Sequence, residues 1–368
     1  MIDWTQAIHD YLTGAASSRF RNQDVAVVDH WQGRDNLLWR VRTSGGHDAV
    51  VKMFTDAGQA RSRRQFSGHE QFAAAGLAPQ PLWYDRYPHG LPRQLLVYRW
   101  AAGDPVQLAL PQHRAALAET VAQVHRADPG AVQRFSPHPF NLLTFWQIWQ
   151  AGEAPLRAWI EQCPAPLLAE ILAMLWSAAH RTMDAALQPL GETPPTPVHG
   201  ELTSRNALFD KDSVILVDWE FFGLGDPAQE VARFLFFEGK DWAMHGRETW
   251  WDCYGPCPAD PGLPDRAELY LRLFHFQAVT FLLDGIRQGE MQDSAAEDPA
   301  AEDPASDSPA SSYRAFLAGA LTAAVRSSLE IWELSRLSEG DDNLLAAELE
   351  QTINVQMTHL HSTAPAAG

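Results

Sequence analysis

Hydrophobic residues at the start of the chain recur at helical spacing, and the pattern then changes to short strand-like runs. The first apolar face contains Trp4, Ile8, Tyr11 and Leu12, which predicts an opening helix. Runs rich in β-branched and apolar residues predict strands at Val25–Val28, Leu37–Val41 and Ala49–Phe54. A Ser-Gly-Gly sequence between the last two runs predicts a hairpin turn within residues 42–48.

One helix interrupts this series of strands. A helical pattern covers residues 61–75 and ends at Gly76, with Pro79 just beyond, as is typical of a helix stop. Two further strands are predicted at Pro81–Tyr84 and Gln94–Tyr98. The amino-terminal part therefore predicts a small sheet with one helix inserted after its third strand.

The rest of the chain is dominated by helical patterns. Residues 101–105 form a plausible linker, after which helical segments are predicted around residues 117–124, 140–150 and 167–187. We therefore expect an α+β protein with a sheet-containing region at residues 1–100 and a mainly helical region at residues 101–368.

An acidic segment at residues 288–312 breaks the helical pattern. It contains two tandem Ala-Glu-Asp-Pro-Ala units among Ser and Pro residues, and it is too polar to offset the entropy cost of ordering. We expect a disordered surface insertion, with a solvated loop favoured over a partner-binding segment. The segment holds seven acidic residues and no Lys or Arg, so the remainder of the chain still carries −11 of the formal net charge of −18. Nucleic acid is not expected as a partner.

Composition indicates a soluble, cytoplasmic protein. The chain has 368 residues, of which 46 % are hydrophobic, enough for one large or two modest cores. Its three cysteines are too few for a disulfide scaffold, and the first residues lack the features of a signal peptide. The longest apolar runs fall short of a membrane span. The oligomeric state is not specified by the sequence.

The most informative segment runs from His199 to Arg233. Glu201 and Asn206 lie in a polar loop, residues 214–217 read as a short buried strand, and Asp218 follows directly. A hairpin would bring these three side chains into one cleft. One carboxylate near an acceptor hydroxyl, with an amide oxygen and a second carboxylate as ligands for a hard cation, is the arrangement that phosphoryl transfer requires.

A second part of this segment has a structural explanation. Asp226 can accept hydrogen bonds from the first amides of a new helix, Pro227 suits the first helical position, and Gln229 completes a pattern similar to a capping box. We therefore expect Asp226 to be a helix cap and not a catalytic residue.

Other motif interpretations fail on spacing. His199-Gly200-Glu201 has the His-x-Glu form of zinc nucleobase deaminases, but the Pro-Cys-x-x-Cys partner is absent, and Cys253 and Cys257 have one residue too many between them. The chain also lacks a P-loop motif and a Gly-x-Ser-x-Gly nucleophile elbow.

The His199–Glu220 pattern resembles the aminoglycoside phosphotransferase and choline kinase branch of the protein-kinase-like superfamily. The shared features are His-Gly-acid, Asn five residues later, and Val-Asp-Trp-Glu at the end of a strand. The resemblance implies a two-lobed fold with a small amino-terminal antiparallel sheet lobe and a larger helical lobe. It also implies that Glu201 is the catalytic acid or base, that Asn206 and Asp218 hold magnesium, and that Glu220 assists a second ion or faces solvent.

The same resemblance places ATP in the amino-terminal region. Lys52 matches the lysine that contacts the phosphates in this family, and residues 32–36 lie where a turn would cover them with a single glycine. Residues 95–100 match the hinge that meets the adenine, so Tyr98 and Trp100 are candidate nucleotide-binding residues.

Two positions depart from the family pattern. Glu201 stands where the family has Asp, and Gln65 aligns with a helix glutamate that pairs with the lysine; Glu70 is an alternative partner on the same helix. Two hypotheses follow. The first is an ATP- and magnesium-dependent kinase acting on a hydroxyl of a small molecule such as an aminoglycoside, an amino alcohol or a sugar. The second is a catalytically impaired pseudokinase that binds nucleotide as a regulatory module.

The acceptor pocket is expected in the helical half. This half contains many tryptophans, which suit either core packing or an aromatic site for an amine or a sugar: Trp146, Trp149, Trp159, Trp176, Trp242, Trp250 and Trp251.

Overall fold

The structure is a computed structural model and describes most of the chain. The described residues are 4–33, 35–55, 61–135, 141–190, 195–239, 242, 244–257, 259–288, 309–334 and 337–363. They form two compact units, each made of two chain segments. The first unit comprises residues 1–140 and 193–264, and the second comprises residues 141–192 and 265–368. The division near residue 100, predicted from the change from strand to helix patterns, stays a prediction.

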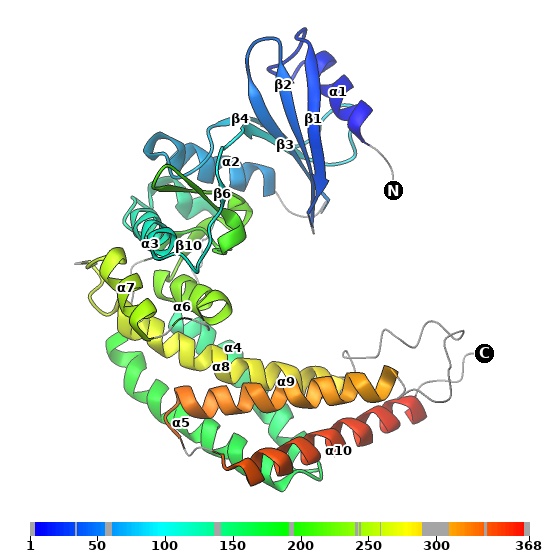
Figure 1. Ribbon diagram of the computed structural model, residues 1–368, viewed down its shortest axis with the longest axis vertical. Coiled ribbons are helices and arrows are strands. Elements are labelled where there is room, and N and C mark those ends of the chain that lie inside the picture. Colours follow the sequence, from blue (N-terminus) through cyan, green and yellow to red (C-terminus); the bar gives the residue numbers. More distant parts are fainter. Residues whose placement is uncertain are drawn as a thin grey trace. The chain divides into compact units, whose positions relative to one another are not determined.

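The first unit begins with a five-stranded antiparallel sheet (Figure 1). The strand order is β1-β2-β3-β5-β4. These strands are β1 (Val25–Gln32), β2 (Asn36–Thr43), β3 (Asp48–Phe54), β4 (Pro81–Asp85) and β5 (Leu95–Arg99). The predicted strands and the hairpin between β2 and β3 are confirmed, and alternate residues of β2, β3 and β5 pack into one apolar core.

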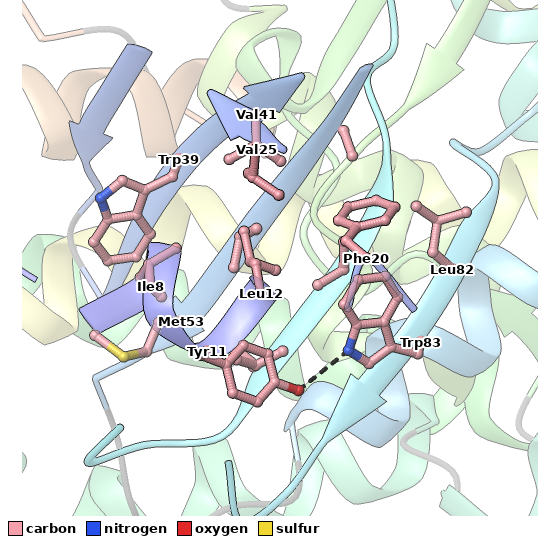
Figure 2. Packing of buried hydrophobic residues seen from close by; sticks show 14 residues of the cluster. Ile8, Tyr11, Leu12, Phe20, Val25, Trp39, Val41, Met53, Leu82 and Trp83 are labelled. Carbon is pink, nitrogen blue, oxygen red and sulfur yellow. Dashed lines mark hydrogen bonds between the residues drawn. The ribbon is translucent and has the colours of Figure 1, made fainter. Parts of the chain in front are cut away.

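Helix α1 (Thr5–Gly14) covers one side of this sheet. Its Ile8, Tyr11 and Leu12 are buried, as the helical spacing predicts, and they pack with Trp39 and Trp83 of the sheet (Figure 2). The Trp83 indole donates a hydrogen bond to the Tyr11 hydroxyl at 3.2 Å. The core of the sheet is thus complete without the helical half of the chain.

Helix α2 (Arg61–Phe72) follows the third strand, and a 3-10 turn, η1 (Ala73–Ala75), leads to Gly76 in the left-handed conformation at φ 75°. The predicted helix and its stop are confirmed. Helix α2 packs against β4, β5 and a later 3-10 turn, η4 (Trp219–Phe221). Gly68 makes this approach possible, because a Cβ atom there would lie 2.9 Å from Trp219 Cβ.

The remainder of the first unit carries short strands between helices. Strand β6 (Asp104–Pro105) pairs with β8 (Ala207–Asp210), which forms a hairpin with β9 (Ser213–Leu216). The end of the predicted linker is therefore a strand, because its backbone completes this sheet. The other elements are α3 (Pro111–His125), η2 (Gly130–Phe135), β7 (Thr196–Val198), η3 (Ser204–Asn206), β10 (Gly223–Gly225), α6 (Pro227–Glu238) and α7 (Met244–Tyr254).

The second unit is helical. Its helices are α4 (Leu142–Ile160), α5 (Pro166–Leu190), most of α8 (Leu263–Gln288), α9 (Pro309–Ile331) and α10 (Glu339–Thr363). Helices α9 and α10 lie side by side, and α10 also contacts α5 (Figure 1). The predicted α+β class, with an amino-terminal antiparallel sheet and a mainly helical remainder, is confirmed.

The predicted acidic insertion falls largely outside the described residues. Residues 289–308 lie beyond them, while Gln288 ends α8 and Pro309 begins α9, so helix reaches both ends of the predicted segment. Within the described part of the chain, none of the helices is both long and apolar enough to cross a membrane.

Candidate active site

The β8–β9 hairpin brings Asn206 and Asp218 together, as the sequence predicts. Asn206 ends the turn before β8, Asp218 follows β9, and the Val217 amide donates to the Asn206 carbonyl at 2.8 Å. Asp218 adopts the left-handed conformation at φ 66° and ψ 55°. This conformation is rare for residues with a Cβ atom, and at such a position it directs the chain sharply into the next turn.

The loop that carries Glu201 is held by buried hydrogen bonds. His199 Nε2 donates to the Val217 carbonyl at 2.9 Å, so its Nδ1 is the acceptor for the Glu201 amide at 3.3 Å. Burial lowers the pKa of His199, in keeping with a neutral ring. The Glu230 carboxylate of α6 accepts from the amides of both His199 and Gly200, at 3.2 and 2.5 Å.

Gly200 is required where it stands. Its φ is +89°, and a Cβ atom at this residue would lie 2.4 Å from the Phe221 carbonyl oxygen. The loop of Glu201 and the segment after Asp218 therefore touch backbone to backbone, which keeps the two carboxylates near each other.

Glu201 itself is half-buried, with a raised pKa. Burial is the main cause, and the negative charges of Asp218 and Glu220 add to it. A carboxyl group with a raised pKa is a better proton acceptor than an exposed glutamate. The Asn206 amide nitrogen donates to the Glu201 carbonyl at 3.0 Å, which leaves the Asn206 oxygen as the group that can serve as a ligand.

Lys52 lies on β3 and is almost completely buried, at 2 % exposure. Its ammonium group contacts Asp218 Oδ1 at 2.5 Å and Glu220 Oε2 at 3.3 Å. In the amide orientation that satisfies its neighbours, Asn36 also accepts from Lys52 at 3.2 Å. A buried ammonium needs such partners because burial removes its hydration.

One cavity of about 1180 Å³ joins these groups within the first unit. Its lining includes the predicted site residues Lys52, Tyr98, Trp100, Glu201, Asn206 and Asp218. The residues after Gln32 and those around Pro105 also contribute to the wall. The volume is large enough for a nucleotide together with a small second ligand.

Gln65 differs from the other predicted residues. It is fully buried on α2, its amide nitrogen lies 3.4 Å from His69 Nε2, and its oxygen has no hydrogen-bond partner among the described residues. It is absent from the cavity lining. Glu70, the alternative partner for Lys52, is exposed.

Glu220, which belongs to the family pattern, is only 4 % exposed, so the alternative that it faces solvent is wrong. Three other polar residues that support the site were not predicted from the sequence: Asn36, Arg61 and Glu230. Asn36 and Arg61 lie far from the motif in the sequence, Glu230 follows it in α6, and the contacts of all three depend on tertiary packing.

The remaining expectations for this region have clear outcomes. Asp226 caps α6 by accepting from the Ala228 amide at 3.0 Å, with Pro227 at the first helical position, as predicted. Trp146, Trp149, Trp176 and Trp250 are buried core residues, while Trp31 and Trp100 are the tryptophans in the cavity lining.

Comparison with known proteins establishes the family. A model of the phosphotransferase enzyme family matches residues 27–270, and the chain therefore belongs to that family. The resemblance read from residues 199–220 is confirmed.

Individual relatives agree with this assignment. A protein described as a probable ketoamine kinase from Thermus thermophilus is 28 % identical over 185 residues, which cover 48 % of this chain and 66 % of that protein. A choline/ethanolamine kinase family protein from Mesorhizobium loti shares the fold at a TM-score of 0.54 and 17 % identity, over 95 % of this chain and 99 % of the other. An aminoglycoside phosphotransferase from Alicyclobacillus acidocaldarius has a TM-score of 0.53 and 17 % identity, over 84 % and 94 % of the two chains. The kinase-like fold is thereby confirmed.

Proposed function

We propose that this protein transfers the γ-phosphoryl group of ATP to a hydroxyl of a small molecule. The observation that carries the proposal is the convergence of Lys52, Glu201, Asn206 and Asp218 on one cavity, in a chain of the phosphotransferase family. An ATP-dependent reaction also favours the cytoplasmic location predicted from the sequence. The pseudokinase alternative gains no support from the family match.

Lys52 binds and orients the nucleotide phosphates. It projects from a central strand and is buried among oxygen atoms, so its position is fixed before a nucleotide arrives. Tyr98 lies on β5 and Trp100 directly follows it, and together they provide the wall against which the adenine packs. Positioning and charge stabilisation supply most of the rate in this class of reaction.

Asn206 and Asp218 fit a magnesium ion. They offer an amide oxygen and a carboxylate, and magnesium bound with a nucleotide commonly uses one or two protein oxygens plus phosphate oxygens. The described residues contain no cluster of three or more His, Cys, Asp or Glu side chains that could hold a metal ion by themselves, so phosphate oxygens would complete the coordination. When bound, magnesium would neutralise charge on the phosphates.

Glu201 orients the acceptor hydroxyl and accepts its proton. Its raised pKa suits this role, and the backbone of its loop is held by Glu230 and His199. The acidic lining, which includes Glu201 and Glu238, favours an acceptor that carries an amine. A ketoamine, an aminoglycoside and an amino alcohol all meet this condition, and the first is the group named for the Thermus relative.

The test is ADP release with ATP and magnesium across ketoamines, aminoglycosides, choline, sugars, homoserine and thiamine. Turnover with one acceptor that disappears in Glu201→Ala, and persists in Glu170→Ala, supports the proposal, because Glu170 is an exposed glutamate of α5 outside the cavity. Turnover that survives in Glu201→Ala contradicts the role of Glu201. Nucleotide binding without turnover on any acceptor contradicts transferase activity.

A further inference from the structure

The carboxylates that pair with Lys52 do not come from helix α2, where the family pattern would place one. The ion pairs of Lys52 are with Asp218 and Glu220, which flank Trp219 on the segment after β9. Glu220 Oε2 lies 3.3 Å from Lys52, and its other oxygen lies 3.4 Å from Arg61 Nη1. Glu220 is 4 % exposed, so this carboxylate is a buried bridge between two cations.

Helix α2 contributes the opposite charge from the one that the family pattern leads us to expect. Its buried polar residues include Gln65 and His69, and neither offers Lys52 a negative charge. Burial, together with the charge of Lys52, lowers the pKa of His69 to about 3, so the ring stays uncharged beside the lysine. Arg61, at the start of α2, then reaches Glu220 as a cation. Helix α2 thus contributes a cation, Arg61, to this network, and the carboxylate comes from Glu220 in η4.

The two carboxylates have different tasks once nucleotide binds. Both carboxylates line the cavity, but Asp218 is 29 % exposed and Glu220 only 4 %, so Asp218 is the group available to a metal ion. Glu220 is held by Lys52 and Arg61, with both of its oxygens already engaged. Lys52 would therefore keep Glu220 as its carboxylate partner when Asp218 turns to a cation.

We propose that Glu220 is the residue that positions Lys52 for the nucleotide phosphates, and that Arg61 fixes Glu220 in place. This inference rests on the proposed function. Glu220 takes the part that a glutamate of α2 would take in the family pattern, so Gln65 does not by itself indicate an impaired site. Glu220 acts here as a positioning residue through Lys52, and not as a ligand of the metal ion.

The experiment measures the Kd for ADP by calorimetry, both in EDTA and in magnesium. Glu220→Gln keeps the size of the side chain and removes its charge, and we expect ADP to bind about tenfold more weakly in both conditions, the scale of one lost hydrogen bond to a charged group. Arg61→Gln should weaken binding in the same direction but less. Glu170→Gln, an exposed change outside the cavity, should bind as the wild type does.

Two further variants separate positioning from a general structural effect. In a Lys52→Met background, Glu220→Gln should cause no additional loss, because the residue through which it acts is absent. Adding Gln65→Glu to Glu220→Gln should restore most of the ADP affinity, because Gln65 contacts His69, a residue close enough to Lys52 for its charge to act on the His69 ring.

The possible results test the role of Glu220 and the proposed function separately. If the wild type binds ADP and Glu220→Gln weakens binding only in magnesium, Glu220 is a metal ligand and the inference is overturned. Unchanged ADP affinity in Glu220→Gln, or full additivity with Lys52→Met, overturns it as well, while the proposed function stands. If the wild type binds no nucleotide, the proposed function fails and the inference fails with it.

Discussion

At the scale of single residues, backbone geometry constrains the site as strongly as side-chain chemistry. Gly200 and Asp218 both have positive φ, and they precede Glu201 and follow Val217. Glycine adopts this conformation without strain, whereas Asp218 is held in it by its surroundings. Part of the motif is therefore explained by backbone geometry. Only residue types that can adopt a positive φ at positions 200 and 218 keep the carboxylates of Glu201 and Asp218 close together.

Gly200→Ala should damage both folding and activity. A Cβ atom would meet the Phe221 carbonyl at 2.4 Å at a φ of +89°, so the backbone must shift. We expect a loss of about 2 kcal/mol or more in the free energy of unfolding, and a fall in turnover. Chemical denaturation measures the first. Gly14→Ala is the matched control, because a Cβ atom there has no neighbour within 4 Å among the described residues; equal effects of the two variants would contradict the argument.

His69 should make stability depend on pH. Burial, followed by the charge of Lys52, lowers its pKa from the ordinary 6.5 to about 3. Above pH 6.5 both folded and unfolded states are neutral at this residue. As pH falls from 6.5 toward 3, the unfolded chain takes up a proton that the folded chain does not, so stability decreases by about 1.4 kcal/mol per pH unit.

The comparison of wild type with His69→Phe isolates this contribution. Phenylalanine keeps a ring beside Tyr98, which packs edge-on against His69 at 4.9 Å, and cannot titrate. Between pH 6.5 and 5 the wild type should lose about 2 kcal/mol more than the variant, as measured by urea unfolding at each pH. Parallel pH profiles for the two proteins would contradict this prediction, because they would mean that His69 takes up a proton as readily in the folded as in the unfolded protein.

At the scale of elements, helix α6 anchors the loop that carries Glu201. Its Glu230 is buried and accepts from two loop amides and from His125 Nε2 at 2.8 Å, while His125 Nδ1 lies 2.8 Å from the Tyr254 hydroxyl. Burial alone would raise the pKa of Glu230, but the hydrogen bond and charge of His125 hold it below its usual value. The chain of contacts from α7 to α3 to α6 thus ends on the active-site loop.

Glu230→Ala should displace this loop. The change leaves buried amides and His125 without their acceptor, and we expect about 3 kcal/mol of destabilisation. Turnover should fall by about 100-fold, the scale expected for a reacting group misplaced by about 1 Å, with ADP affinity nearly unchanged because Lys52 is untouched. Kinetics and calorimetry on the same preparation separate the two effects. Equal losses in turnover and in ADP affinity would indicate general unfolding instead of loop displacement.

The sequence predicted individual helices and strands better than it predicted contacts between them. The sheet strands, α1, the end of α2 and the β8–β9 hairpin follow from local periodicity and turn residues, which act over a few positions. The partners of Lys52 did not follow. Glu220 and Lys52 are 168 residues apart, and Arg61 and Glu220 are 159 apart, so only the tertiary fold brings their charges together. The pairing of β6 with β8 escaped prediction for the same reason.

At the scale of the whole molecule, the cavity and its supporting network belong to one unit. Every residue that lines the cavity lies within residues 1–140 or 193–264. Each unit also has its own buried apolar residues. The family match, at residues 27–270, covers most of the first unit and part of the second.

Nucleotide should therefore stabilise the first unit selectively. Hydrogen exchange should be slower in β3, β5 and residues 199–225 when saturating ADP and magnesium are present. Amide exchange requires local opening, and bound nucleotide makes local opening of these segments less favourable. Amides of α9 and α10 should exchange at unchanged rates, since neither helix contributes to the cavity lining. Asp218→Asn is the control: ADP with magnesium should slow exchange of the same amides less in this variant than in the wild type. Protection confined to α9 and α10 would place the nucleotide site in the second unit.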